Sequence, residues 1–206
     1  WMIQDFEQDV VELEFRKQKE GSVRLIAEVG WKSEKREKEG KKVPYIKETT
    51  RIIIHQVKGN YRKIDFEINL LAMEGDPRFA GSEDDKGYSG FSVRMKLPED
   101  IQFSGPEGRI EPQRTAVKSE GFVKISGSLM GKDVKGGIVI IDDPENPDYP
   151  QSWILRRKSS MQNAAYPGRE PVALSPDDPM VLKYSLIVYT GKMSTKKIRR
   201  IIDKNK

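Results

Sequence analysis

The stretch that decides the fold is Ile64-Asp65-Phe66-Glu67-Ile68-Asn69-Leu70, in which apolar and polar side chains alternate without a break. Successive side chains of an extended strand point to opposite faces, so this period of two predicts a β-strand with one buried and one solvated face. Residues 91–97 repeat the pattern, with Phe91, Val93, Met95 and Leu97 in phase. These two stretches are the clearest strands in the sequence.

Weaker strand signals surround them. Val11, Leu13 and Phe15 alternate with two glutamates, which predicts one apolar and one charged face, and Ile52-Ile53-Ile54 indicates a strand buried on both faces. Further candidates are residues 23–31, 122–129, 137–141, 152–156 and 181–189. About eight to ten strands separated by turn clusters are typical of stacked antiparallel sheets. We therefore expect an all-β fold, an antiparallel two-sheet β-sandwich.

Two other segments have distinct patterns. Residues 32–42 hold no apolar side chain to bury, which predicts a solvated hairpin loop between two strands. Near the C-terminus, Ser194 or Thr195 is placed to cap a helix. That helix would carry Ile198, Ile201 and Ile202 on one face and basic residues on the other. We expect one short C-terminal helix.

Composition limits the chemistry. The chain has 206 residues, a length that fits a single domain over residues 1–206. It has no cysteine and one histidine, His55. Disulfides, thiolate catalysis and zinc sites built on sulfur are thereby excluded, and sites with several imidazoles are hard to build. We expect no metal and no cofactor.

Charge and hydropathy limit the partners. No apolar run reaches the roughly 18 residues that a membrane helix needs, so we expect no membrane span. The net charge of +5 comes from 37 basic and 32 acidic residues, interleaved along most of the chain. Such interleaving indicates an ordinary solvated surface, and we expect no nucleic-acid partner. The nucleic-acid alternative rests only on charge and the C-terminal helix, and the oligomeric state stays open.

Several segments carry a resemblance to a known family. Residues 136–156 have the sequence GGIVIIDDPENPDYPQSWILR, preceded by KGYSGFSVR at residues 86–94. Asn163 and LKYSLIVYTG at residues 182–191 follow. Together these segments resemble the bacterial PmoA-like family, usually labelled "methane oxygenase PmoA", over roughly residues 50–203. No span here suits membrane methane oxidation.

The resemblance implies a β-sandwich similar to the large two-sheet folds, or supersandwiches, of sugar mutarotases and polysaccharide lyases. It also implies an association with bacterial carbohydrate use. The chain departs from the family pattern, because Asp143 and Tyr149 stand where family members have His, and an upstream segment rich in His and Asp is missing. We therefore expect the domain to lack an N-terminal segment of the family. We expect an extracytoplasmic (periplasmic or secreted) protein, although the given chain carries no signal peptide.

Five residues are candidates for a site. Asp143, at the end of an apolar strand, is the candidate catalytic acid/base, although an Asp at this place also serves to bond a turn. Arg94 and Arg156 would position a hydroxyl or carboxylate, because a guanidinium fork suits both. Asn163 would orient a ligand or bond a turn, and Trp153 would stack on a sugar ring or fill the core.

These candidates lead to a functional hypothesis. Arg94 lies on the polar face of its strand, and Asp143 and Arg156 flank one loop, so we expect the three to surround one cleft. The preferred function is a carbohydrate-associated protein that binds, or acts on, a saccharide or other small polar ligand. The alternative is a non-catalytic binding or structural module, and whether the chain is an enzyme stays open.

Overall fold

The computed structural model describes residues 5–129, 134–158 and 161–203. Both ends of the predicted domain, residues 1–4 and 204–206, lie outside this range. A single α-helix is described, and a 3-10 turn spans Lys19–Gly21. The elements in chain order are β1 (Glu7–Lys17), β2 (Val23–Lys38), β3 (Lys41–Ile54), β4 (Tyr61–Ala72), β5 (Arg78–Phe79), β6 (Phe91–Arg94), β7 (Gln102–Gly105), β8 (Gly108–Ile110), β9 (Val117–Lys118), β10 (Phe122–Gly127), β11 (Gly136–Asp142), β12 (Ser152–Ile154), β13 (Met161–Ala165), β14 (Val172–Ala173), β15 (Met180–Thr190) and α1 (Thr195–Asp203).

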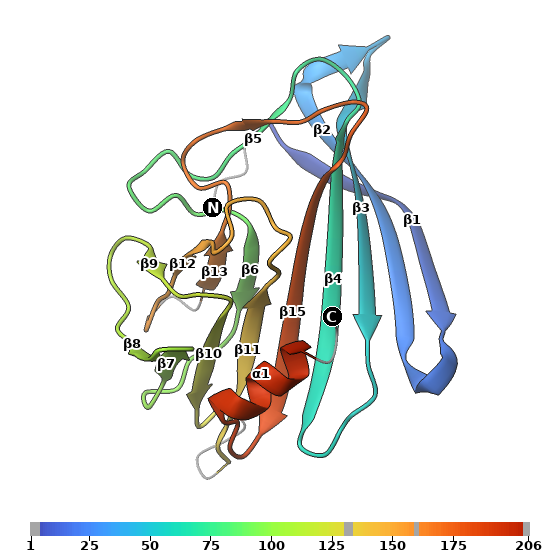
Figure 1. Ribbon diagram of the computed structural model, residues 1–206. Coiled ribbons are helices and arrows are strands. Elements are labelled where there is room, and N and C mark those ends of the chain that lie inside the picture. Colours follow the sequence, from blue (N-terminus) through green and yellow to red (C-terminus); the bar gives the residue numbers. More distant parts are fainter. Residues whose placement is uncertain (1–4, 130–133, 159–160, 204–206) are drawn as a thin grey trace.

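Two antiparallel sheets make up most of the fold (Figure 1). The larger has nine strands in the order β1-β2-β3-β4-β15-β11-β10-β7-β8. The smaller has four, in the order β6-β13-β12-β9, and β14 pairs with β5 in a separate ribbon. The predicted all-β antiparallel architecture with a C-terminal helix is confirmed.

The core between the sheets follows the predicted alternation. Phe66 and Ile68 of β4 pack against the core cluster that also contains Trp153 of the smaller sheet. In residues 91–97 the strand ends at Arg94, earlier than predicted, because only residues 91–94 pair with β13. The apolar side chains of this stretch, Phe91, Val93, Met95 and Leu97, still pack against the same core, although they are only partly buried.

Helix α1 covers part of the outer face of the larger sheet. Ile198 and Ile201 are buried in a cluster with Val139 and Ile187 from β11 and β15. Ser194 Oγ accepts a hydrogen bond from the backbone N–H of Lys197 at 3.2 Å, as the predicted cap requires. No helix among the described residues is both long and apolar enough to cross a membrane.

Two details differ from the sequence prediction. Residues 32–42 belong mostly to strands, since β2 runs to Lys38, β3 starts at Lys41, and the turn between them is Glu39 and Gly40 at positive φ. The charged side chains suit an exposed hairpin just as they suit a loop. Residues 52–54 are only partly buried, so the prediction of a strand buried on both faces was wrong. None of these three residues belongs to the core cluster between the two sheets.

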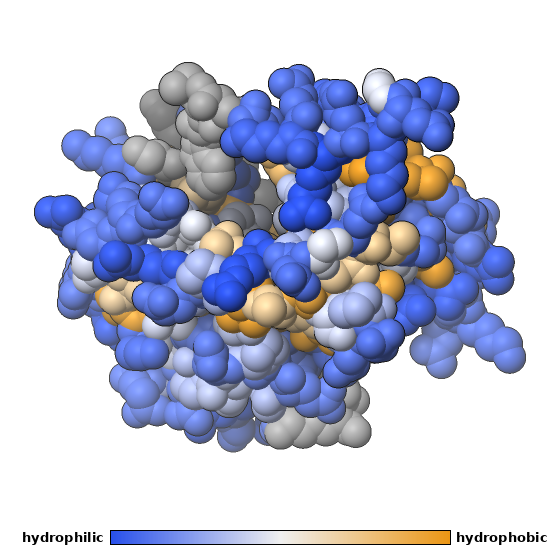
Figure 2. Space-filling view, turned by 90° about the horizontal axis from the view of Figure 1, so that it is seen from above, coloured by the Kyte–Doolittle hydropathy of each residue, from blue (hydrophilic) through white to orange (hydrophobic). Residues whose placement is uncertain are grey.

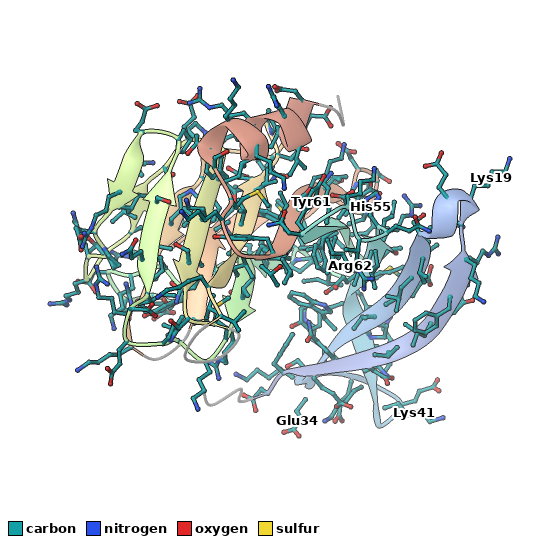
Figure 3. All side chains as sticks on the ribbon, turned by 90° about the horizontal axis from the view of Figure 1, so that it is seen from below. Lys19, Glu34, Lys41, His55, Tyr61 and Arg62 are labelled. Atoms are coloured by element: carbon teal, nitrogen blue, oxygen red, sulfur yellow. The ribbon has the colours of Figure 1, made fainter. Side chains whose placement is uncertain are left out.

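The first strands therefore leave an apolar face uncovered. Strand register places Phe15, Leu25, Ile52 and Phe66 in one row across β1 to β4. Phe66 packs in the core, whereas Phe15 is 64% exposed. In Figure 3, β1 and β2 curve away from the rest of the molecule, with Lys19 at one end of this arm and Glu34 and Lys41 at the other. The predicted apolar face of β1 exists, but it faces solvent.

Candidate functional site

A cavity of about 300 Å³ lies between the inner face of the larger sheet and the segment that leads into β6. Phe79 of β5 lines it, which places it toward the end of the molecule where β5 lies in Figure 1. Seen from that end, apolar residues form a band across the middle of the surface (Figure 2). The volume suits a ligand of monosaccharide size. The lining residues that the argument uses are Trp31, Glu48, Phe79, Tyr88, Asn163 and Tyr184.

Aromatic side chains form much of the cavity wall. Trp31 meets Phe79 edge-on, with ring centres 6.3 Å apart, and Phe91 stacks on Tyr184 with ring centres 4.8 Å apart. Tyr184 comes from the inner face of β15, where it follows Leu182 in the period of two. The wall therefore offers flat apolar faces of the kind that pack against a sugar ring.

Glu48 supplies the carboxylate of the cavity. It occupies an inner-face position of β3 in phase with Ile46 and Ile52, where apolar residues are expected. Trp31 Nε1 donates to Glu48 Oε2 at 2.9 Å, and Thr50 Oγ1 donates to Glu48 Oε1 at 2.7 Å. Each carboxylate oxygen can accept more than one hydrogen bond, so Glu48 keeps acceptor capacity for a ligand.

Asn163 carries an acceptor without a partner. The residue is 1% exposed on β13, and its Nδ2 donates to the Ser89 carbonyl at 3.3 Å and to Ser92 Oγ. A carbonyl only accepts, so Ser89 fixes which end of the amide is the nitrogen. Asn163 Oδ1 is left with no hydrogen bond in the described chain. A buried acceptor of this kind costs about 1–3 kcal/mol until a donor reaches it.

Tyr88 is held at the cavity by Arg156. Arg156 Nε donates to Tyr88 Oη at 2.9 Å. The same guanidinium donates to the carbonyls of Gln113 and Arg114, at 2.8 and 2.9 Å. Arg156 follows the end of β12, and its bonds tie residues 113–114 to the segment that lines the cavity.

Comparison with known proteins gives one result. The model of a family of unknown function, DUF6807, matches residues 4–203. The chain belongs to the DUF6807 family. No curated protein and no solved structure matches it.

The structure distributes the five predicted site residues of this DUF6807 chain over different environments. Asn163 lines the cavity, and the other four do not. Trp153 is 0% exposed in the core, where its Nε1 donates to the Ser119 carbonyl at 2.9 Å. Arg94 is exposed at the end of β6, and Asp143 Oδ1 accepts the Glu145 N–H at 3.0 Å within the turn. Arg156 meets Tyr88, which does line the cavity.

The loop after β11 in the DUF6807 chain connects to the cavity through Tyr184. Tyr184 Oη donates to Gln151 Oε1 at 2.9 Å, and the Gln151 N–H donates to Asp142 Oδ2 at 2.9 Å. Asp142 is 1% exposed, and burial raises its pKa against the opposing effect of the bonds from Asn146 and Gln151. Burial also raises the pKa of Tyr184. The loop thus positions one aromatic wall of the cavity.

A second polar cluster of the DUF6807 chain lies on the outer face of the sheet. Asp65 accepts hydrogen bonds from His55 Nε2 at 2.6 Å, Lys63 Nζ at 2.8 Å and Ser185 Oγ at 2.5 Å. His55 lies beside Tyr61 and Arg62 in Figure 3. Ser185 donates to Asp65 and not to His55, so this is not the arrangement that activates a serine nucleophile. Within the described ranges, no three His, Asp or Glu side chains are grouped as metal ligands would be.

Sequence reasoning missed most of the cavity residues, namely Trp31, Glu48, Phe79, Tyr88 and Tyr184. A signal for Glu48 was present, because it is an acidic residue in phase with Ile46 and Ile52 on a strand. No comparable signal marked Trp31 or Phe79, since an aromatic residue in phase on a strand is more often part of the core. Three of the four segments that carry the family resemblance, at residues 86–94, 163 and 182–191, contribute to this one cavity.

Proposed function

We propose that this protein binds a saccharide, or a small polar ligand of similar size, in the cavity lined by Trp31, Glu48 and Asn163. The observation that carries the proposal is the lining of the cavity of about 300 Å³, which combines aromatic side chains with the carboxylate of Glu48 and the amide residue Asn163. A ligand hydroxyl would donate to the Glu48 carboxylate, and the ligand ring would pack on the aromatic wall.

Two further features support a ligand rich in hydroxyl groups. Glu48 and Asn163 are acceptors, and Tyr88 Oη accepts from Arg156 and so keeps its own proton to donate. A saccharide presents both donors and acceptors around an apolar ring face. The sequence resemblance to the PmoA-like family, with its association with carbohydrate use, favours the same class of ligand.

Catalysis is a separate proposal. Asp143, the predicted acid/base, bonds the turn through one carboxylate oxygen and does not line the cavity. Binding alone is therefore the function that the geometry supports best. An acid/base role for Asp143 would require the loop at residues 142–151 to present the carboxylate to a ligand seated elsewhere.

The test is titration of the protein with glucose, galactose and mannose, followed by calorimetry. We expect saturable binding that is lost in Ala80→Trp, because Ala80 is an exposed cavity residue whose enlargement fills the mouth without disturbing the core. The matched control is Val57→Trp, at a position 56% exposed and outside the cavity lining. Binding that survives Ala80→Trp, or no heat with any sugar, would remove the proposal.

A further inference from the structure

The cavity has an acidic wall with no basic counterpart. Among its described lining residues Glu48 is the one ionisable carboxylate, and no Lys, Arg or His is present. This lining contrasts with the chain as a whole, which has a net charge of +5. A ligand carrying a carboxylate or phosphate would therefore meet a like charge in the cavity and no compensating cation.

Glu48 also lacks a cationic partner among the described residues. Its hydrogen bonds come from the neutral groups of Trp31 and Thr50, and no ion pair joins it to another side chain of the described ranges. The neighbouring cation on the same strand, Lys47, pairs with Glu28 at 2.9 Å. Neutral donors hold the carboxylate in place without neutralising it, so its charge is available to a ligand.

Two cations lie beside a lining residue, Tyr88. The Arg156 guanidinium carbon is 5.3 Å from the centre of the Tyr88 ring, and Lys86 Nζ is 5.8 Å from it. Neither residue lines the cavity, and Arg156 is occupied by its bonds to Tyr88 and to backbone carbonyls. Glu48 is therefore the one charged side chain among the described lining residues, and it would orient a ligand with its positive group toward itself.

We infer that the cavity selects a ligand with a protonated amine, such as an amino sugar, over neutral and acidic sugars. The amine would bind at Glu48 beside the indole of Trp31, because carboxylates and aromatic faces both attract ammonium groups. This inference rests on the proposed saccharide site and adds the charge of the ligand.

The experiment compares glucosamine, glucose and glucuronic acid by calorimetry at a pH of about 6, where an amine is protonated. We expect glucosamine to bind at least tenfold more tightly than glucose, and glucuronic acid to bind more weakly than glucose. In Glu48→Gln, glucosamine and glucose should bind equally. The amide keeps both internal bonds, because its oxygen accepts from Trp31 and its nitrogen donates to Thr50. Glu28→Gln, on the same sheet but outside the cavity, should leave the preference unchanged.

The outcomes separate the two proposals. Equal binding of glucose and glucosamine, lost in Ala80→Trp, would overturn the amine preference and leave the saccharide site standing. A glucosamine preference that persists in Glu48→Gln would also overturn it. Tetramethylammonium tests the selection for a positive charge without a sugar. If it binds to the wild type, if Glu48→Gln abolishes that binding and if no sugar binds, the preference for a cation stands and only the saccharide proposal fails. If neither sugars nor tetramethylammonium bind, both proposals fall.

Discussion

Arg156 contacts both the hydroxyl group and the ring face of Tyr88. The Nε of Arg156 donates to Tyr88 Oη at 2.9 Å, while the guanidinium carbon lies 5.3 Å from the centre of the tyrosine ring. A residue predicted to touch the ligand thus fastens a residue of the cavity wall. The remaining guanidinium nitrogens bond three backbone carbonyls, those of Gln113, Arg114 and Leu155.

Replacing this arginine should lower stability. We expect Arg156→Ala to reduce the free energy of unfolding by about 2–4 kcal/mol, because several charge-assisted bonds to carbonyls are lost together. Urea denaturation measures the change. Arg199→Ala, on the exposed face of α1, should change it by less than about 0.5 kcal/mol. Wild-type stability of Arg156→Ala combined with lost sugar binding would instead favour a direct ligand role.

Asn163→Asp should show a pH-dependent loss of stability. The new carboxylate would face the Ser89 carbonyl in a buried position, so burial and the missing donor would raise its folded pKa above the unfolded value of about 3.9. The cost relative to wild type should then be small below pH ~4 and grow as pH rises through the folded pKa. Denaturation at several pH values checks this. Asn163→Ser does not titrate there, and its cost should not follow pH in this way.

Asp65→Asn should show the opposite pH dependence. Burial raises the pKa of Asp65, but the bonds from Lys63, Ser185 and His55 outweigh burial and hold the pKa below its ordinary value. The stabilisation is therefore present above the unfolded pKa and lost as pH falls through the folded pKa. We expect Asp65→Asn to cost about 1–3 kcal/mol at neutral pH, from its lost bonds, and less in acid. A gap that stays constant down to acid pH would contradict this account. Asp178→Asn, at an exposed position, is the matched control.

Ser194→Ala should weaken the attachment of α1. The substitution removes the bond from the Lys197 N–H to Ser194 Oγ, and the loss of such a cap costs about 1 kcal/mol. Ile198→Ala, at a position 0% exposed, should cost about 2–5 kcal/mol because it also leaves a cavity. Thermal unfolding ranks the two. An equal effect of both substitutions would mean that the helix is held by its cap and not by its buried face.

The strand pattern of this chain was predictable because alternation is a local property. Phe66, Ile68 and Leu70 had to share one face of any extended strand, and that face is the inner one. Which inner faces are covered was not predictable, because coverage depends on how far the smaller sheet extends. Phe15 lies in the same strand row as Phe66 and is 64% exposed, whereas Phe66 packs against the core.

The site was harder to predict for a related reason. A tryptophan on a strand looks the same whether it fills the core or lines a cavity, and Trp153 does the first while Trp31 does the second. Asn163 was predictable through the family resemblance. Its partnerless oxygen was not, because the amide is oriented by bonds from its nitrogen to Ser89 and Ser92, some 70 residues earlier in the chain. Glu48 carried a signal that was missed. A charged residue in phase with apolar residues lies on the inner face of a strand, where a charge is unusual and indicates a candidate site.

The position of β15 has a consequence for folding. Strands β1 to β4 pair with their neighbours in sequence, whereas β15 lies between β4 and β11 and joins the two parts of the larger sheet. Its pairing of Leu182 with Ile68 spans more than half of the chain, and such distant pairings form slowly because a long loop must close first. Leu182 and Tyr184 on this strand also complete the cavity wall. The ability to bind a ligand in the cavity should therefore appear only with this late closure, and a bound ligand should slow global unfolding by holding β15 in place.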